Sequence, residues 1–218
     1  MGNLRIAAVP SVRRLPSYLH IIRDAQAEGG EYISGTVIAG ELKLEAIQVR
    51  KDLAITGIIG RPKKGYPIKP LIKAIESFLG WDSRRDAVLV GVGNLGSALL
   101  GYQEFSRHGL NFVAAFDNNP KKIGAGIHSL KIMSARNMAA QIRGFGVKTA
   151  VLTVPSSYAQ ETANILVEAG IEGIWNFTNR KLKVPDHVVV QKEDLSSGYA
   201  MLCVTMNASR KGKKSGSA

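Results

Sequence analysis

Apolar residues recur at helical spacing through the first 80 residues of the chain. Leu15, Leu19 and Ile22 share one face of a helix expected over residues 11–27, because positions three or four apart lie on the same side of an α-helix. The charged, turn-forming segment Gly80–Arg85 ends this region and predicts a linker. The first 80 residues are therefore expected to form a small helical domain.

Two short helices joined by a tight turn are expected within this region. They cover residues 35–42 and 46–53, with three residues between them. In the second helix apolar residues share one face, which leaves Gln48, Arg50 and Lys51 to face outward. This is the plan of a helix-turn-helix, whose second helix enters the major groove of DNA.

A basic segment bounded by glycines follows the two helices. It carries Arg61, Lys63 and Lys64 between Gly60 and Gly65. Such a hairpin can act as a wing that lies along DNA phosphates, because cationic side chains bind the phosphate backbone. The alternative interpretation is a small helical cap on a nucleotide-binding enzyme.

After residue 85, short apolar runs alternate with helical segments. This alternation is typical of a parallel sheet with helices on both faces. Strands are expected over residues 87–90, 112–116, 150–153, 173–176 and 188–190, and helices over residues 95–107, 137–145 and 159–169.

A glycine-rich turn follows the first expected strand. Gly91, Gly93 and Gly96 form the pattern G-x-G-x-x-G. In a dinucleotide site these glycines permit the tight turn, the approach of backbone N–H groups to a pyrophosphate, and close packing of helix on strand. Asp117 ends the next strand, 21 residues past Gly96, where it can bind a ribose diol and would repel a 2′-phosphate. The spacing therefore indicates NAD(H) binding and favours NAD over NADP.

Composition narrows the class of protein. The chain has 218 residues, 45% of them hydrophobic, and a single cysteine, which excludes a disulfide framework and a cysteine-based metal site. No apolar run reaches the ~18 residues of a membrane span, and no secretory signal is recognisable, so a cytoplasmic protein without a membrane partner is expected. The histidines lack metal-ligand or triad spacing, so neither a metal nor a catalytic residue is expected.

Positive charge is concentrated at the two ends of the chain. The net charge is +12. Residues 1–85 carry 14 basic and 8 acidic side chains, residues 86–208 carry 11 and 9, and the last ten residues carry four basic and no acidic ones. Excess positive charge attracts polyanions such as DNA, although a basic surface also serves solubility.

Three segments carry a resemblance to a known family. They are Arg14–Leu19, Gln48–Leu53, and the glycine turn Gly91–Gly96 followed by Phe116–Gly124. Together they resemble the Rex family of bacterial redox-sensing transcriptional repressors. The segments Leu152–Pro155, Trp175–Thr178, Val184–Pro185 and Glu193–Leu195 fit the same family.

This resemblance implies a homodimer in which a winged-helix domain binds operator DNA and a Rossmann domain binds NAD(H). In the family a raised NADH/NAD⁺ ratio closes the dimer and releases the DNA. The expected fold class is α/β: an N-terminal winged-helix domain, a Rossmann-type doubly wound parallel sheet and a C-terminal domain-swapped helix. The expected boundaries are residues 1–80, 81–191, 192–208 for the swapped helix and 209–218 for a basic disordered tail.

The resemblance also assigns roles to residues. Tyr102 and Asp194 of the partner subunit match the pair that senses the nicotinamide oxidation state, and His20 stands where the family usually carries an arginine that pairs with this aspartate. The expected DNA-binding residues are Gln48, Arg50 and Lys51 on the second helix and Arg61, Lys63 and Lys64 on the wing. The expected cofactor-binding residues are Gly91, Gly93, Asn94, Leu95, Gly96, Asp117, Asn118, Thr153, Val154, Pro155, Asn176 and Phe177.

Three other functions fit parts of the pattern. A small NAD-dependent oxidoreductase would need a substrate cavity and an acid or base beside the nicotinamide. Only about 105 residues lie between the linker and the final helix, which is enough for the cofactor-binding fold but leaves no residues for a catalytic domain. A CoA- or nucleotide-binding module without a DNA-binding role also uses glycine-rich turns, but Asp117 argues against it. The third is a DNA-binding protein whose Rossmann domain only mediates dimerisation.

Overall fold

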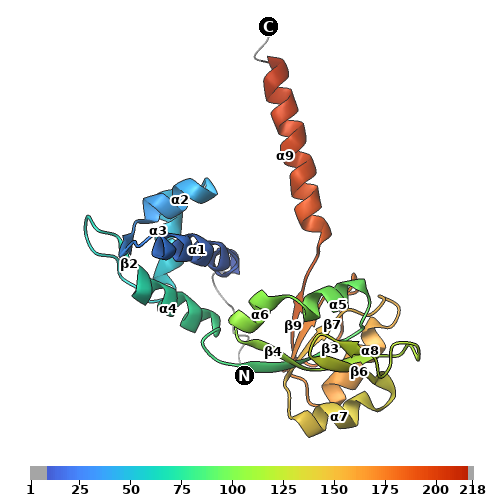
Figure 1. Ribbon diagram of the computed structural model, residues 1–218. Coiled ribbons are helices and arrows are strands. Elements are labelled where there is room, and N and C mark those ends of the chain that lie inside the picture. Colours follow the sequence, from blue (N-terminus) through green and yellow to red (C-terminus); the bar gives the residue numbers. More distant parts are fainter. Residues whose placement is uncertain (1–8, 216–218) are drawn as a thin grey trace. The chain divides into compact units, whose positions relative to one another are not determined.

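The computed structural model describes residues 9–215, with side chains through residue 208 (Figure 1). The chain divides into two compact units. One contains the residues up to Arg84 together with Arg107–Gly109, and the other contains Arg85–Ser106 and the residues from Leu110 onward. Each unit has its own buried apolar core.

The first unit is a small helical domain with a two-stranded antiparallel sheet. Its core collects buried side chains from every helix, among them Leu15, Ile38, Leu53 and Leu71. The helices predicted from hydrophobic spacing are confirmed, and a fourth helix and the small sheet complete a winged-helix domain. The elements are α1 Val9–Ala27, β1 Tyr32–Ile33, α2 Gly35–Leu42, α3 Ala46–Ala54, β2 Tyr66–Pro67 and α4 Ile68–Leu79.

The second unit is built on a seven-stranded sheet in the order β5-β6-β4-β3-β7-β8-β9. Every neighbouring pair is parallel except β5 and β6, which confirms the predicted Rossmann-type sheet. The strands are β3 Arg85–Val90, β4 Leu110–Asp117, β5 Gly126–Ile127, β6 Leu130–Ser134, β7 Thr149–Leu152, β8 Gly173–Asn176 and β9 Val189–Lys192. The helices are α5 Asn94–Leu100, α6 Gln103–Arg107, α7 Met138–Phe145 after a 3₁₀ turn, α8 Ala159–Glu168 and α9 Ser196–Ser215.

Alternate residues of the central strand face opposite helix layers. Val88 packs in one cluster with Ile142 of α7 and Leu166 of α8, whereas Leu89 packs with Leu99 of α5. Figure 1 shows α5 and α7 on opposite sides of the sheet. The chain leaves β3 toward β4 and β6 and then returns to β7 on the other side of β3. At such a reversal the loops after the two strands part and leave a crevice for a ligand.

The fold differs from the expectation in three ways. The helix expected over residues 95–107 is broken at Gly101 into α5 and α6. A Cβ placed on Gly101 would lie only 2.5 Å from His128 Cε1, so a larger residue does not fit there. The pair β5 and β6 was not predicted. Helix α9 runs on through residues that were expected to begin the tail, because arginine and lysine are good helix formers. The remaining tail residues, 216–218, lie outside the described part of the chain.

Candidate functional site

The turn after β3 uses its three glycines in three different ways. Gly91 has φ +101°, and a Cβ there would lie 2.8 Å from the carbonyl carbon of Thr153. A Cβ on Gly96 would overlap the Gly91 carbonyl oxygen, so α5 packs this closely only with glycine at that position. Apart from its chain neighbours, no described atom lies within 4 Å of a Cβ placed on Gly93. A ligand can therefore approach the backbone at Gly93.

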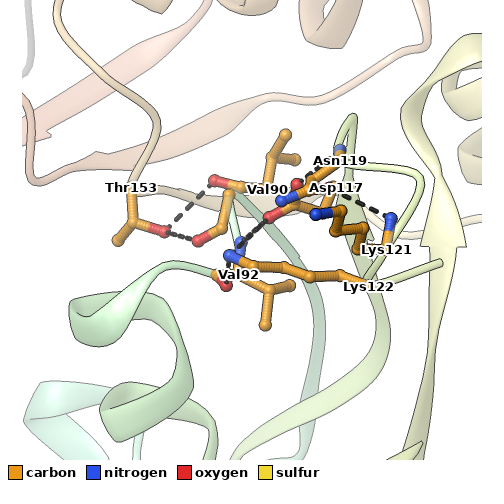
Figure 2. Close-up of polar contacts among 8 residues, drawn as sticks. Val90, Val92, Asp117, Asn119, Lys121, Lys122 and Thr153 are labelled. Carbon is orange, nitrogen blue, oxygen red and sulfur yellow. Dashed lines mark hydrogen bonds and ion pairs between the residues drawn. The ribbon is translucent and has the colours of Figure 1, made fainter. Parts of the chain in front are cut away.

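Hydrogen bonds hold this turn against β4 and β7. Gly91 N–H donates to the Phe116 carbonyl over 2.8 Å, and Thr153 N–H donates to the Val90 carbonyl over 2.9 Å. Figure 2 shows the Thr153 hydroxyl beside the turn, where it donates to the Gly91 carbonyl over 2.7 Å. Thr153 therefore shapes the turn with its own side chain.

Asp117 lies at the carboxyl end of β4 and is only 8% exposed. One carboxylate oxygen accepts the Val92 N–H over 2.9 Å, and the other accepts the Asn119 N–H over 2.8 Å. Because each carboxylate oxygen can accept two hydrogen bonds, both can still accept one from a ribose hydroxyl. The ammonium of Lys122, a residue that was not predicted, lies 3.6 Å from the carboxylate.

A cavity of about 740 Å³ opens at this turn, within the size range of small-molecule sites. Nine of the expected cofactor residues line it: Gly91, Gly93, Asn94, Leu95, Asp117, Asn118, Thr153, Val154 and Pro155. Sequence reasoning missed other lining residues. In the turn after β4 they are Asn119 and Lys122, and on or next to α7 and α8 they include Met138, Tyr158, Glu161, Thr162 and Ile165. The mixture of apolar and polar side chains suits a ring system joined to charged groups.

Three expected cofactor residues, Gly96, Asn176 and Phe177, are not among the residues that line this cavity. Asn176 is fully buried, and its side-chain amide donates to the Arg180 carbonyl over 2.9 Å while its oxygen accepts from Thr178. Asn176 therefore shapes the loop after β8. Phe177 packs against Trp175, with ring centroids 4.9 Å apart.

Tyr102 begins a row of aromatic rings in the second unit. It lies between α5 and α6 and is 54% exposed. Its ring centroid is 4.9 Å from that of Phe105, which lies 5.3 Å from the ring of Trp175. The Trp175 indole N–H donates to the Glu193 carboxylate over 3.2 Å. The row thus links Tyr102 to the residue before Asp194.

Asp194 lies two residues before Ser196, the first residue of α9. Its carboxylate accepts both the hydroxyl and the backbone N–H of Ser196. These two bonds hold the pKa of Asp194 below its ordinary value, because they favour the charged form. The pairing of Tyr102 with Asp194 of the partner subunit stays a prediction.

The second helix of the helix-turn-helix presents a basic face. On α3 the side chains of Arg50 and Lys51 are exposed, whereas Val49 and Leu53 are buried. This is the arrangement predicted for a helix that reads DNA. Ile47 is 56% exposed and adds an apolar residue to the exposed surface of α3 that was not predicted. His20 is exposed on α1.

Asp52 follows Lys51 on α3, is fully buried, and connects this helix to α1 through hydrogen bonds. Its carboxylate accepts from Arg14 over 2.6 Å, Tyr18 over 2.6 Å, Ser11 over 2.7 Å and Gln48 over 2.7 Å. Burial by itself raises the pKa of Asp52, but these hydrogen bonds outweigh burial and hold it below its ordinary value. Burial and the bond to Asp52 raise the pKa of Tyr18 to about 12. Gln48 thus differs from the expectation, since its amide turns inward to Asp52.

The loop after α3 forms the wing. Arg61 N–H donates to the Gly65 carbonyl over 2.7 Å and closes the hairpin, with Lys63 near its tip at φ +62°. The Arg61 guanidinium also donates to the Tyr32 hydroxyl over 2.7 Å. Arg61, Lys63 and Lys64 are all exposed. Their contact with DNA phosphates stays a prediction.

Two other kinds of site are absent from the described residues. Between residues 9 and 215, no helix has the length and apolar character needed to cross a membrane. In the same part of the chain, no group of three or more His, Cys, Asp or Glu side chains could hold a metal ion.

Comparisons with known proteins match the two units separately and the chain as a whole. Residues 8–54 match a family described as "Putative DNA-binding protein N-terminus", and residues 82–180 match "CoA binding domain". The chain is 59% identical to the redox-sensing transcriptional repressor Rex of Treponema denticola, over 96% of this chain and 100% of that protein. It is 39% identical to the protein of the same name from Bacteroides fragilis, over 91% of this chain and 89% of that one.

Solved structures are similar over the same length. RSP, a Rex-family repressor, was solved in complex with beta-NADH; it is 30% identical, with a TM-score of 0.86 over 96% of this chain and 98% of that one. Its complex with beta-NAD⁺ and operator DNA gives a TM-score of 0.84 at 30% identity, over 98% and 97% of the two chains. The similarity therefore covers both units.

Proposed function

Because the chain belongs to the Rex family of redox-sensing transcriptional repressors, we propose that it binds operator DNA when NADH is scarce and releases it when NADH binds. One observation carries this proposal: a single chain combines the cavity at the glycine turn and Asp117 with the exposed basic face of α3. The relative solved with NADH and with NAD⁺ and operator DNA supports each half. The family consists of repressors, and the chain is not an enzyme.

NAD(H) is the ligand that the cavity supports best. The match of residues 82–180 to a family named for CoA is compatible with the same turn, since either ligand places a pyrophosphate at a helix N-terminus. Two observations favour NAD(H). Asp117 ends β4 beside the glycine turn, the position at which dinucleotide sites carry the acid that binds a ribose diol, and the relative RSP was solved with both oxidation states of this cofactor.

In this proposal the active form is a homodimer in the cytoplasm. Helix α9 supports the dimer, because it leaves large apolar side chains exposed that a partner subunit would cover. They are Tyr199, Met201, Leu202 and Val204. Association through α9 would bring Asp194 of the partner subunit toward Tyr102, as the family resemblance implies.

Fluorescence anisotropy with an operator duplex tests the proposal. The duplex is one selected by the protein from a random pool, and its affinity is measured without cofactor, with NAD⁺ and with NADH at one salt concentration. NADH should weaken binding by about tenfold or more, and NAD⁺ should not. If NADH binds tightly and leaves the affinity for DNA unchanged, the second unit has only a structural role and the proposal is wrong.

A further inference from the structure

Lys122 brings a positive charge to the carboxylate on which the expected cofactor preference depends. It lies in the turn after β4, where its N–H donates to the Asn119 carbonyl over 3.0 Å. Its ammonium donates to the Val92 carbonyl over 2.6 Å and lies 3.6 Å from the Asp117 carboxylate (Figure 2). The side chain is 38% exposed and lines the cavity. Lys122 is therefore part of the cavity wall.

The ammonium of Lys122 can bind a further oxygen atom. An ammonium has three N–H donors, and the Val92 carbonyl takes one of them. The separation of 3.6 Å from Asp117 is an ion pair and is too long for a hydrogen bond. An oxygen of a ligand that enters beside Asp117 can therefore accept a hydrogen bond from Lys122.

The charge of Asp117 by itself would make this corner of the cavity negative. Hydrogen bonds from Val92 and Asn119 hold the carboxylate in place. An adenosine ribose bound here presents a 2′-hydroxyl in NAD(H) and a 2′-phosphate in NADP(H), and the carboxylate repels the phosphate. The cation at 3.6 Å offsets part of this repulsion, because a phosphate within reach of the Lys122 ammonium is attracted by it while the carboxylate repels it.

We propose that Lys122 is a specificity-determining residue of the cofactor site, which donates to the 2′ oxygen of the adenosine ribose or to a 2′-phosphate there. The ion pair of Asp117 and Lys122, and not Asp117 alone, then sets the preference between NADH and NADPH. The proposal rests on the proposed NAD(H)-binding function. It changes the expectation from the sequence: NADH is preferred, but NADPH is tolerated.

Calorimetric titration of NADH and NADPH into the full-length protein and the variant Lys122→Met tests this role. The ratio of the NADPH to the NADH dissociation constant should rise about tenfold, since a charged hydrogen bond to the phosphate is lost at a partly exposed site. Lys121→Met is the matched control. It removes the same charge from the adjacent exposed residue, which is not among the cavity-lining residues, and should leave the ratio within about twofold of wild type.

A second variant separates specificity from a structural role in the turn. Lys122→Arg keeps the positive charge, so its ratio should stay near that of the wild type even if the affinity for both cofactors falls. A ratio that is unchanged in Lys122→Met, or that rises equally in Lys122→Arg or Lys121→Met, overturns the proposal for Lys122 while NADH binding by the wild type keeps the proposed function. A wild-type protein that binds neither cofactor overturns both.

Discussion

The buried carboxylate of Asp52 connects stability to DNA recognition. In Asp52→Ala, Arg14 and Tyr18 lose their shared acceptor, so the free energy of unfolding should fall by about 2–4 kcal/mol. Urea denaturation measures the loss. Operator affinity should fall as well, because the register of α3 against α1 depends on this cluster. The exposed Asp24 provides the control, and an Asp24→Ala variant as unstable as Asp52→Ala would contradict the account.

The same carboxylate makes stability depend on pH. The pKa of Asp52 in the folded protein lies below its ordinary value. Its contribution is therefore fully present above the unfolded pKa of about 3.9 and is lost as the pH falls toward the folded value. Urea unfolding at about pH 6 and about pH 3 should show a larger loss for the wild type than for Asp52→Asn, which cannot titrate at that position. Equal losses would show that Asp52 is not the titrating group.

Asp117 should influence which cofactor binds. In Asp117→Ala the affinity for both cofactors should fall, because the turn loses the acceptor of the Val92 and Asn119 N–H groups. The preference for NADH over NADPH should nevertheless narrow, since the charge that repels a 2′-phosphate is gone. Calorimetry on both cofactors measures the ratio. An unchanged preference would remove Asp117 from the ribose site.

At the level of elements, the turn between β3 and α5 permits a paired test. Gly93→Ala places a methyl group in open space, whereas Gly96→Ala places it against the Gly91 carbonyl. Gly93→Ala should therefore keep the melting temperature and lose NADH affinity, and Gly96→Ala should lower both. Thermal unfolding and calorimetry on the two variants separate ligand approach from packing. A Gly93→Ala variant that binds NADH normally would show that the cofactor does not approach this turn.

Helix α3 and the wing should contribute to DNA binding in different ways. If Arg50 contacts a guanine, Arg50→Ala should cost about 1–3 kcal/mol on the selected operator and relax the preference at one base pair. Lys63→Ala should weaken binding to all sequences alike and reduce the salt slope by about 1. Anisotropy over a series of salt concentrations and operator variants measures both. Unchanged binding in a double variant of Arg50 and Lys51 would contradict the winged-helix assignment.

Local signals predicted the elements whose ends depend on nearby residues. Helix α2 and strand β8 have the predicted bounds, Gly35–Leu42 and Gly173–Asn176, because apolar spacing and flanking turn residues specify them. The break between α5 and α6 lies instead at Gly101, where the imidazole of His128 occupies the space that a Cβ would take. This contact comes from a distant part of the chain and leaves no local pattern.

The same distinction applies to the candidate site. The glycine turn and Asp117 could be predicted because the motif is local and its spacing is regular. Gln48 was expected to face outward, but its amide turns inward to the buried Asp52. The burial of Asp52 depends on Arg14 and Tyr18 from another helix, which the local pattern around Gln48 does not show. Lys122 was missed because only the folded turn brings it to Val92. The sequence did place it shortly after the aspartate that ends the strand, within the segment Phe116–Gly124 that carries the family resemblance.

At the level of the whole molecule, redox sensing requires that the two units influence each other. A ligand shifts a conformational equilibrium only if its affinity differs between the states. If NADH favours a dimer that cannot bind operator DNA, then operator DNA must weaken NADH binding by the same factor. Redox sensing by this chain therefore shows itself as two affinities, for NADH and for operator DNA, that change by one common factor.

The most direct test measures both halves of this linkage in one buffer. The dissociation constant of NADH is measured with and without saturating operator duplex, and that of the operator with and without saturating NADH. Both should rise by the same factor, about 10–100-fold, which corresponds to a coupling free energy of about 1.4–2.7 kcal/mol. If NADH binds equally well to the free protein and to the protein–operator complex, the cavity and the DNA-binding face are not coupled and the account is contradicted.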